Sequence, residues 1–181
     1  MRRTPSTPTG AMSTPGNVEW TATVTEPLPN CPSVEAAWER LATQTRWPEW
    51  RSQSKMRGRR VITTLVPPAT EPLRVGDEYV VRVGRLMRVR CRVVDSSSLA
   101  SEGGETDEMI FDATGEALGG VVKARFRFTI FRTEGGLVMA RAEEKVTSLL
   151  FLAPSRATLE SEHRHTFKEL DRSFSSPAPS D

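Results

Sequence analysis

The chain is poor in the residue types on which metal sites, disulfide frameworks and nucleophilic active sites depend. Its 181 residues include two cysteines, two histidines and one tyrosine. Cys31 and Cys91 make neither a disulfide framework nor a metal-ligand spacing, so we expect reduced thiols in an intracellular protein. A glycine-rich phosphate loop, a nucleophile elbow and a dinucleotide-binding fingerprint are also missing. These absences argue against a nucleotide-dependent or metal-dependent enzyme, and we expect neither a cofactor nor a metal site.

Long apolar runs and a strong excess of one charge are missing as well. No run approaches the roughly 20 apolar residues that cross a bilayer, so we expect no stable membrane insertion. The net charge of +2 is too small to imply a nucleic-acid partner. The opening MRRTPSTPTGAMSTPG lacks the apolar core of a secretory signal. Its arginines and its Ser/Thr content suggest a weak transit peptide, but its prolines argue against the helix that such a peptide forms. We expect a cytoplasmic protein.

Both ends of the chain are rich in Pro, Ser and Thr, which predicts a disordered arm over residues 1–17 and a disordered tail over 175–181. Residues 18–174 are predicted to form one domain. Its first segment, 18–28, alternates as a strand does. Ser33 is a good N-cap for a helix that follows, and Pro48 limits the segment 46–50 to a short helical turn.

Further strand-like runs occupy most of the remaining domain. They lie at 59–66, 73–83, 86–94, 107–114, 121–131 and 137–146, and the segment from Pro154 to about Arg172 reads as a long amphipathic helix. An antiparallel sheet needs a cover for its apolar face, and this helix is the one long element available. The sequence therefore predicts an α+β helix-grip fold: a seven-stranded antiparallel sheet wrapped around a long C-terminal helix, with two short helices after the first strand.

Several local segments occur in a characteristic order. They are the opening strand followed by Pro32 to Trp38, the WPEW turn at 47–50, the LRVGDEY turn at 73–79, the TEGGLVMARAEE hairpin at 133–144 and the closing helix. In these features the chain resembles the SRPBCC superfamily, particularly its polyketide cyclase/dehydrase and lipid-transport branch, related to START domains and birch-pollen allergens. The resemblance implies a hydrophobic cavity between sheet and helix. It does not imply one reaction, because the superfamily mixes carriers, cyclases, hydrolases and chaperone activators.

Strand alternation assigns the side chains of each strand to two faces. We expect the apolar face to be concave and to bind a ligand together with the helix and the 46–50 turn. The predicted lining is Trp50, Tyr79, Met87, Val89, Cys91, Met109, Phe111, Phe126, Phe128, Ala140, Ala142, Leu159, His163 and Phe167. The opposite face carries the arginines between Arg82 and Arg92, which we interpret as members of a solvated ion-pair ladder with Glu108 and Asp112 rather than as a phosphate-binding stripe.

The two histidines, His163 and His165, are two residues apart on the predicted helix and therefore point about 200° apart. They cannot converge on one metal or substrate. His163 falls within the apolar stripe of the helix, whereas His165 falls toward solvent. His163 is either a buried histidine satisfied by a neighbouring carbonyl or hydroxyl, or a cavity-facing group that orients a ligand oxygen or acts as general acid/base, or a surface residue.

Glu144 shares its strand face with Ala140, Ala142 and other apolar residues. If that face is concave, Glu144 enters an apolar space and could form an acid/base couple with His163. The alternative is that Glu144 lies at the strand end and pairs with Arg156 or meets water. Both possibilities are compatible with the sequence.

Three functions are compatible with this pattern. The first is a module that binds a hydrophobic or amphipathic small molecule of lipid, polyketide or terpenoid type. The second is a cofactor-independent polyketide cyclase, dehydratase or isomerase in which His163, with Glu144, moves protons. The third is a partner-binding or chaperone-activating domain that uses its outer surface. The scarcity of polar candidates on the apolar face favours the first.

Overall fold

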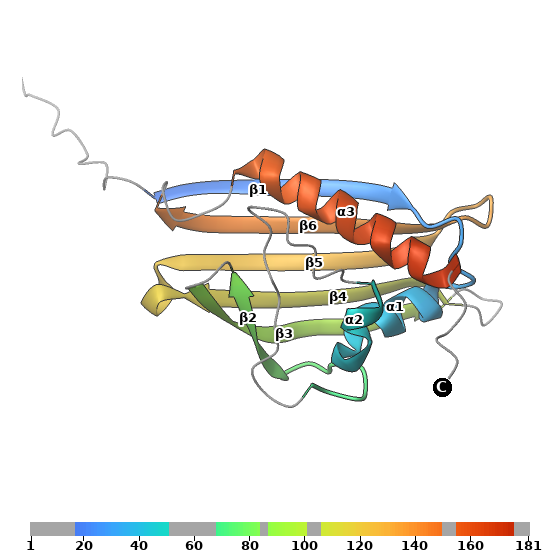
Figure 1. Ribbon diagram of the computed structural model, residues 1–181, viewed down its shortest axis with the longest axis horizontal. Coiled ribbons are helices and arrows are strands. Elements are labelled where there is room, and N and C mark those ends of the chain that lie inside the picture. The colour runs from blue at the N-terminus through green and yellow to red at the C-terminus, as the bar shows by residue number, and fades with distance from the viewer. Residues whose placement is uncertain (1–16, 51–67, 84–86, 101–105, 150–154, 176–181) are drawn as a thin grey trace, which may run out of the picture.

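The protein is described by a computed structural model, which places residues 17–50, 68–83, 87–100, 106–149 and 155–175. A first strand is followed by short helices, then by a run of strands and a long helix, as predicted (Figure 1). The first part comprises β1 (Asn17–Pro27), α1 (Val34–Ala42), the 3-10 helix η1 (Gln44–Arg46) and α2 (Trp47–Trp50). The remainder comprises β2 (Glu78–Val83), β3 (Met87–Ala100), β4 (Thr106–Ala117), the 3-10 helix η2 (Leu118–Gly120), β5 (Val122–Arg132), β6 (Val138–Leu149) and α3 (Arg156–Ser175).

All the described strands form one antiparallel sheet in the order β1-β6-β5-β4-β3-β2. The predicted count of seven strands was wrong, because the sheet formed by the described residues has six. The run at 59–66, which we expected to supply a further strand, lies outside the described residues. The run at 73–83 becomes a strand only at Glu78, since the residues before it form a turn.

Glycines with positive φ close the two predicted turns. In the turn before β2, Gly76 has φ +95°, and the Asp77 carboxylate accepts a 2.7 Å hydrogen bond from the Arg74 amide. In the β5–β6 hairpin, Gly136 has φ +80° and its amide donates to the Thr133 carbonyl at 2.8 Å. Glycine adopts this backbone conformation without steric cost, so both turns follow directly from the sequence.

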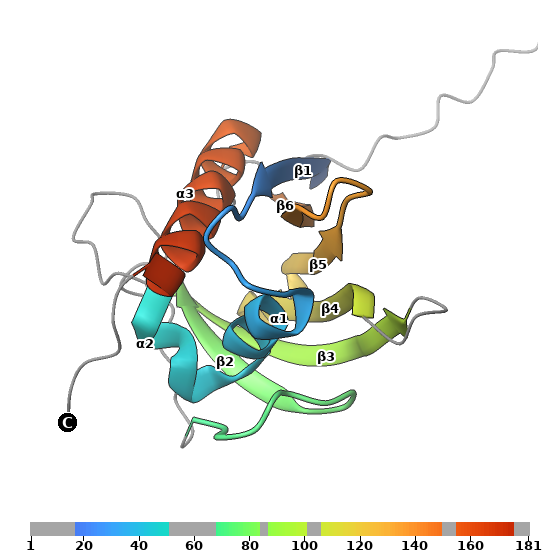
Figure 2. The ribbon, with the colours of Figure 1, turned by 90° about the vertical axis from the view of Figure 1, so that its right-hand side faces the viewer.

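The helices lie on one side of the curved sheet (Figure 2). Ser33 caps α1 as predicted, because its hydroxyl accepts a 3.1 Å hydrogen bond from the Ala36 amide. α1 contacts β4 and β5, whereas α3 contacts β1 and β6. The two helices therefore cover different halves of the same concave face. Among the described residues, no helix combines the length and the apolar character needed to cross a membrane.

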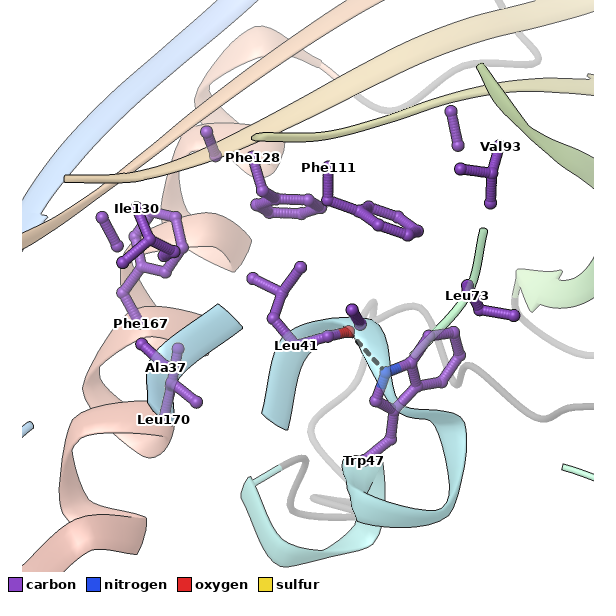
Figure 3. Close-up of a cluster of buried hydrophobic side chains, with 14 of the residues drawn as sticks. Ala37, Leu41, Trp47, Leu73, Val93, Phe111, Phe128, Ile130, Phe167 and Leu170 are labelled. Carbon is purple, nitrogen blue, oxygen red and sulfur yellow. Dashed lines mark hydrogen bonds between the residues drawn. The ribbon is translucent and has the colours of Figure 1, made fainter. Parts of the chain in front are cut away.

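The apolar faces of the strands and helices meet in the core between them (Figure 3). Phe167 and Leu170 of α3 are fully buried, as is Ile130 of β5. Trp47 is anchored by a 2.8 Å hydrogen bond from its indole nitrogen to the Leu41 carbonyl. The concave assignment of the apolar strand faces is thus confirmed for the side chains that the structure describes.

The C-terminal half of α3 is held by polar contacts to the segment that follows β1. The Asp171 carboxylate accepts hydrogen bonds from the amide of Asn30 at 2.8 Å and from its side chain at 2.6 Å. The Arg40 guanidinium lies 3.8 Å from the centre of the Phe174 ring, a cation–π contact. We call the Asn30–Asp171 contact the helix clamp. It fixes α3 along its axis and in rotation.

The convex face carries only part of the ion-pair ladder that we expected. Asp112 of β4 pairs with arginines of β5, whereas among the described residues no ion pair joins Glu108 or Asp112 to Arg88, Arg90 or Arg92 of β3, so that side of the prediction was wrong. Asp112 of β4 is fully buried, and its carboxylate accepts hydrogen bonds of 2.8–3.1 Å from Arg125 and lies 3.3 Å from the Arg127 guanidinium. These hydrogen bonds raise the pKa of Arg125. Glu108 makes no comparable ion pair with the residues that the structure describes. The ladder is therefore centred on Asp112.

Candidate functional site

A carboxylate and an imidazole meet between the sheet and α3. Nε2 of His163 lies 2.9 Å from Oε2 of Glu144, and the two residues are 5% and 2% exposed. Glu144 reaches the concave face because it alternates with Ala142 and Val146 along β6, both of which are buried. The alternative partner Arg156 instead pairs with Glu160 at 2.8 Å. The couple that the sequence left open is therefore formed, and we call it the Glu144–His163 pair.

The surroundings of the Glu144–His163 pair are apolar. The Phe128 ring meets the imidazole edge to face, with centroids 5.8 Å apart and an interplanar angle of 77°. Leu159 and Phe167, one helical turn to either side of His163, are fully buried. In the sheet, Glu144 stands between Phe126 of β5 and Ala22 of β1. Desolvation strengthens an interaction between two such polar groups, but it also makes their burial costly.

The second histidine does not join this site. His165 retains 32% side-chain exposure, and its Nε2 lies 3.9 Å from the Glu169 carboxylate. The two histidines thus have separate partners, Glu144 and Glu169, and the structure does not bring them together. Over the part of the chain that the structure describes, no group of three or more His, Cys, Asp or Glu side chains is placed to hold a metal ion.

Most of the predicted lining lies on the concave face or on the facing stripe of α3. The buried members are Tyr79, Val89, Cys91, Phe111, Phe128, Ala140, Ala142, Leu159, His163 and Phe167, and Met109 and Phe126 are partly buried. The side chains of Met87 and Trp50 lie outside the described residues, although their backbones belong to β3 and α2. Whether any of these side chains contacts a ligand stays a prediction.

Tyr79 is not brought together with the Glu144–His163 pair. It lies on β2, and β3, β4 and β5 separate that strand from β6. Four strand spacings correspond to about 19 Å measured along a sheet. The Tyr79 ring instead meets Trp47 edge to face, with centroids 5.7 Å apart. The concave face therefore carries polar groups near two separate edges and apolar side chains between them.

Two features of this face were missed from the sequence. Glu26 lies on the same face of β1 as Ala22 and Val24, and its carboxylate is 3.6 Å from the Arg164 guanidinium of α3. Gly115 lies in β4 opposite Cys91, where an added Cβ would come within 2.8 Å of a Val89 methyl group. The alternation of the first strand predicts the position of Glu26, and a glycine inside a strand indicates a close approach of this kind.

Together, the curved antiparallel sheet and the C-terminal helix across its concave side define an α+β protein of the helix-grip class. No protein-family model matches the sequence. No curated protein matches it either.

Solved structures, in contrast, match most of the chain. An uncharacterized protein from Rhizobium leguminosarum is 11% identical with a TM-score of 0.60, covering 88% of this chain and 96% of that chain. A hypothetical protein from Helicobacter pylori is 11% identical with a TM-score of 0.60, covering 93% and 98%. Norcoclaurine synthase from Thalictrum flavum, a helix-grip protein, is 9% identical with a TM-score of 0.50, covering 95% of each chain. Identities this low establish the fold alone.

Proposed function

We propose that the protein binds a hydrophobic or amphipathic small molecule, of lipid, polyketide or terpenoid type, against the concave face of its sheet beneath α3. The observation that carries this proposal is the Glu144–His163 pair, buried on a face that is otherwise apolar around it. A buried ionisable pair contributes little net stability, because desolvation offsets the attraction between its members. A polar pair in such a place is better explained as the group that orients a ligand.

The apolar side chains around the pair would supply the affinity. Burial of apolar surface contributes about 25 cal/mol per Å², before the cost of ordering both partners is subtracted. Ala140 and Ala142 stand opposite Ile130 and Phe128 in the sheet, and both are small side chains on the face that α3 covers. Small residues there limit how far the protein's own side chains fill the space. The ligand-binding character of the helix-grip fold adds support at the level of the fold.

Native mass spectrometry of the purified protein tests this proposal. We expect additional mass from a co-purified apolar molecule, lost when the same sample is denatured. Ala142→Leu, on the concave face of β6, should reduce that occupancy, whereas Arg141→Leu, on the half-exposed opposite face of the same strand, should leave it unchanged. Ligand-free wild-type protein that also takes up no fluorescent apolar probe would contradict the proposal.

The geometry of the pair also favours a second candidate, a cofactor-independent cyclase, dehydratase or isomerase. In this function His163 would act as general acid/base, and the Glu144 carboxylate, 2.9 Å away, would orient the imidazole and stabilise its protonated form. One protein of similar fold is by name a synthase. His163→Ala separates the two functions: a carrier should lose modest affinity, whereas an enzyme of this kind should lose about 10²–10⁴-fold in turnover.

A further inference from the structure

The strand β3 presents a row of three arginines on the convex face of the sheet. Arg88, Arg90 and Arg92 are exposed, and each residue between them is buried. Successive side chains on one face of a strand lie about 6.6 Å apart along it. Within the part of the chain that the structure describes, none of the three guanidinium groups forms a hydrogen bond or an ion pair. We call this set the β3 arginine row, and it is open to an anion outside the fold.

The β3 arginine row ends beside the hairpin that joins β4 to β5. Arg90 pairs with Glu116 in the β3–β4 register, so the antiparallel pairing carries Arg88 towards Leu118, the first residue of η2. The Glu116 carboxylate lies 4.0 Å from Lys123 of β5, which adds a further cation at this hairpin. The cationic residues and η2 therefore meet at the end of the sheet where β1 begins (Figure 1).

Leu118 has a backbone conformation that leucine normally avoids. Its φ of +52° is the one positive value among the non-glycine residues that the structure describes. This left-handed conformation brings the Cβ atom close to a carbonyl oxygen and destabilises the fold. The side chain is nevertheless not buried, because Leu118 is 54% exposed, and Val121, which follows η2, is 43% exposed. A strained turn that presents apolar side chains to solvent indicates a contact with a partner rather than a contribution to folding.

We propose that this end of the convex face docks reversibly on a membrane that contains anionic phospholipids. The docking surface, which we call the docking corner, consists of Leu118, Val121, Lys123, Arg88 and Arg90. The cationic side chains bind lipid phosphates, while the two apolar side chains enter the boundary between headgroups and acyl chains. A single-stranded nucleic acid fits less well, since none of these five side chains offers an aromatic ring for a base to stack on. This docking is peripheral, and it does not depend on the binding of an apolar ligand beneath α3.

Co-sedimentation of the full chain with lipid vesicles tests the proposal. Wild type should bind vesicles of equal amounts of phosphatidylcholine and phosphatidylglycerol more tightly than vesicles of phosphatidylcholine alone, and added salt should weaken this binding. The double variant Arg88→Ser/Arg90→Ser should bind the anionic vesicles about 25-fold more weakly, since each basic residue near such a surface contributes about fivefold. Leu118→Asn should bind them at least about threefold more weakly. Its thermal midpoint should not fall, because asparagine adopts a left-handed conformation more readily than leucine.

The matched control is Arg141→Ser/Arg172→Ser, which changes the net charge by the same amount. These arginines are 52% and 72% exposed and lie towards the other end of the fold, so vesicle binding should stay close to that of wild type. Wild-type protein that does not sediment with the anionic vesicles would overturn the proposal. An equal loss in the control would do so too, because net charge alone would then explain the binding. Wild-type vesicle binding by Leu118→Asn, with single-stranded DNA binding that the Arg88/Arg90 variant loses, would assign the arginines to nucleic acid and overturn the membrane assignment.

Discussion

The stability of variants of the Glu144–His163 pair offers the sharpest test of why the pair is buried. We consider Glu144→Leu, His163→Leu and the double variant, since leucine is apolar and similar in size to both residues. The pair joins β6 to α3 through a 2.9 Å contact, and both residues are at least 95% buried. Each single variant leaves the other polar group in an apolar space, whereas the double variant removes both groups together.

The expected magnitudes differ strongly between the single variants and the double variant. Glu144→Leu leaves the His163 ring without its partner, which should lower the free energy of unfolding by about 1–3 kcal/mol. His163→Leu leaves a buried carboxylate, with an expected loss of about 3–5 kcal/mol. The double variant should lie within about 1 kcal/mol of wild type or above it, because apolar replacements of buried ion pairs are often neutral or stabilising. The resulting coupling energy is at least about 3 kcal/mol.

Urea denaturation and thermal melts measure these differences. For a chain of 150–250 residues each kcal/mol corresponds to about 2–4 °C, so His163→Leu should lower the Tm by at least about 6 °C. Glu143→Leu is the matched control: this residue neighbours Glu144 in β6, keeps 40% side-chain exposure and should shift stability by less than about 0.5 kcal/mol. A double variant as unstable as the sum of the two single variants would refute the reasoning, since the two residues would then contribute to stability independently rather than through their contact.

Three further predictions concern the concave face, the convex face and a buried thiol. Ala142→Leu should change the free energy of unfolding by less than about 1 kcal/mol in urea titrations if the space beneath α3 is open to a ligand, whereas a loss of about 1–3 kcal/mol would indicate a solidly packed interior. Asp112→Ala should lower the free energy of unfolding by about 2 kcal/mol or more, because it leaves Arg125 and Arg127 without their buried partner. The control Glu116→Ala removes an exposed carboxylate 4.0 Å from Lys123 and should cost less than about 0.5 kcal/mol. Equal losses in the two variants would contradict this contrast. Burial raises the pKa of the Cys31 thiol from its ordinary 9.0 to about 11, so between these pH values the folded state retains a proton that the unfolded chain releases. The free energy of unfolding should therefore fall as the pH rises from 9 to 11. Cys31→Ala should remove that part of the pH dependence in denaturation curves, and an unchanged profile would show that the thiol does not contribute.

Much of the fold could be predicted because its strands alternate cleanly. The concave positions of β6, including Glu144, follow from a period of two, and the position of His163 follows from the spacing of the α3 stripe. The start of β2 was misplaced because turn chemistry prevailed over alternation there. Between Arg74 and Asp77 the chain forms a hydrogen-bonded turn, although Leu73 and Val75 alternate with polar residues as a strand would.

The length of β3 was also missed. The run was predicted to end at residue 94, and an aspartate and three serines follow it. In the structure β3 continues to Ala100, paired with β4, after an irregularity in the register between Val93 and Asp95. Pairing with a neighbouring strand thus overrides the weak strand propensity of Asp and Ser. No local pattern in the sequence predicts that extension.

From the sequence, contact between Glu144 and His163 was one of two possibilities, the other being a strand-end position in which Glu144 pairs with Arg156 or meets water. The sequence could not decide between them, because the assignment of side chains to faces does not say how far a helix is shifted along a sheet. That shift depends on a contact between residues 141 positions apart, the helix clamp of Asn30 and Asp171. His163 lies eight residues before Asp171, which is about 12 Å along the helix axis. A shift of α3 by one residue would rotate His163 by about 100° and take its ring away from β6. The clamp and the buried Phe167 and Leu170 also hold this register, so we expect α3 to keep its place without the pair. For that reason the double leucine variant should keep the fold while losing the polar group that we propose a ligand contacts.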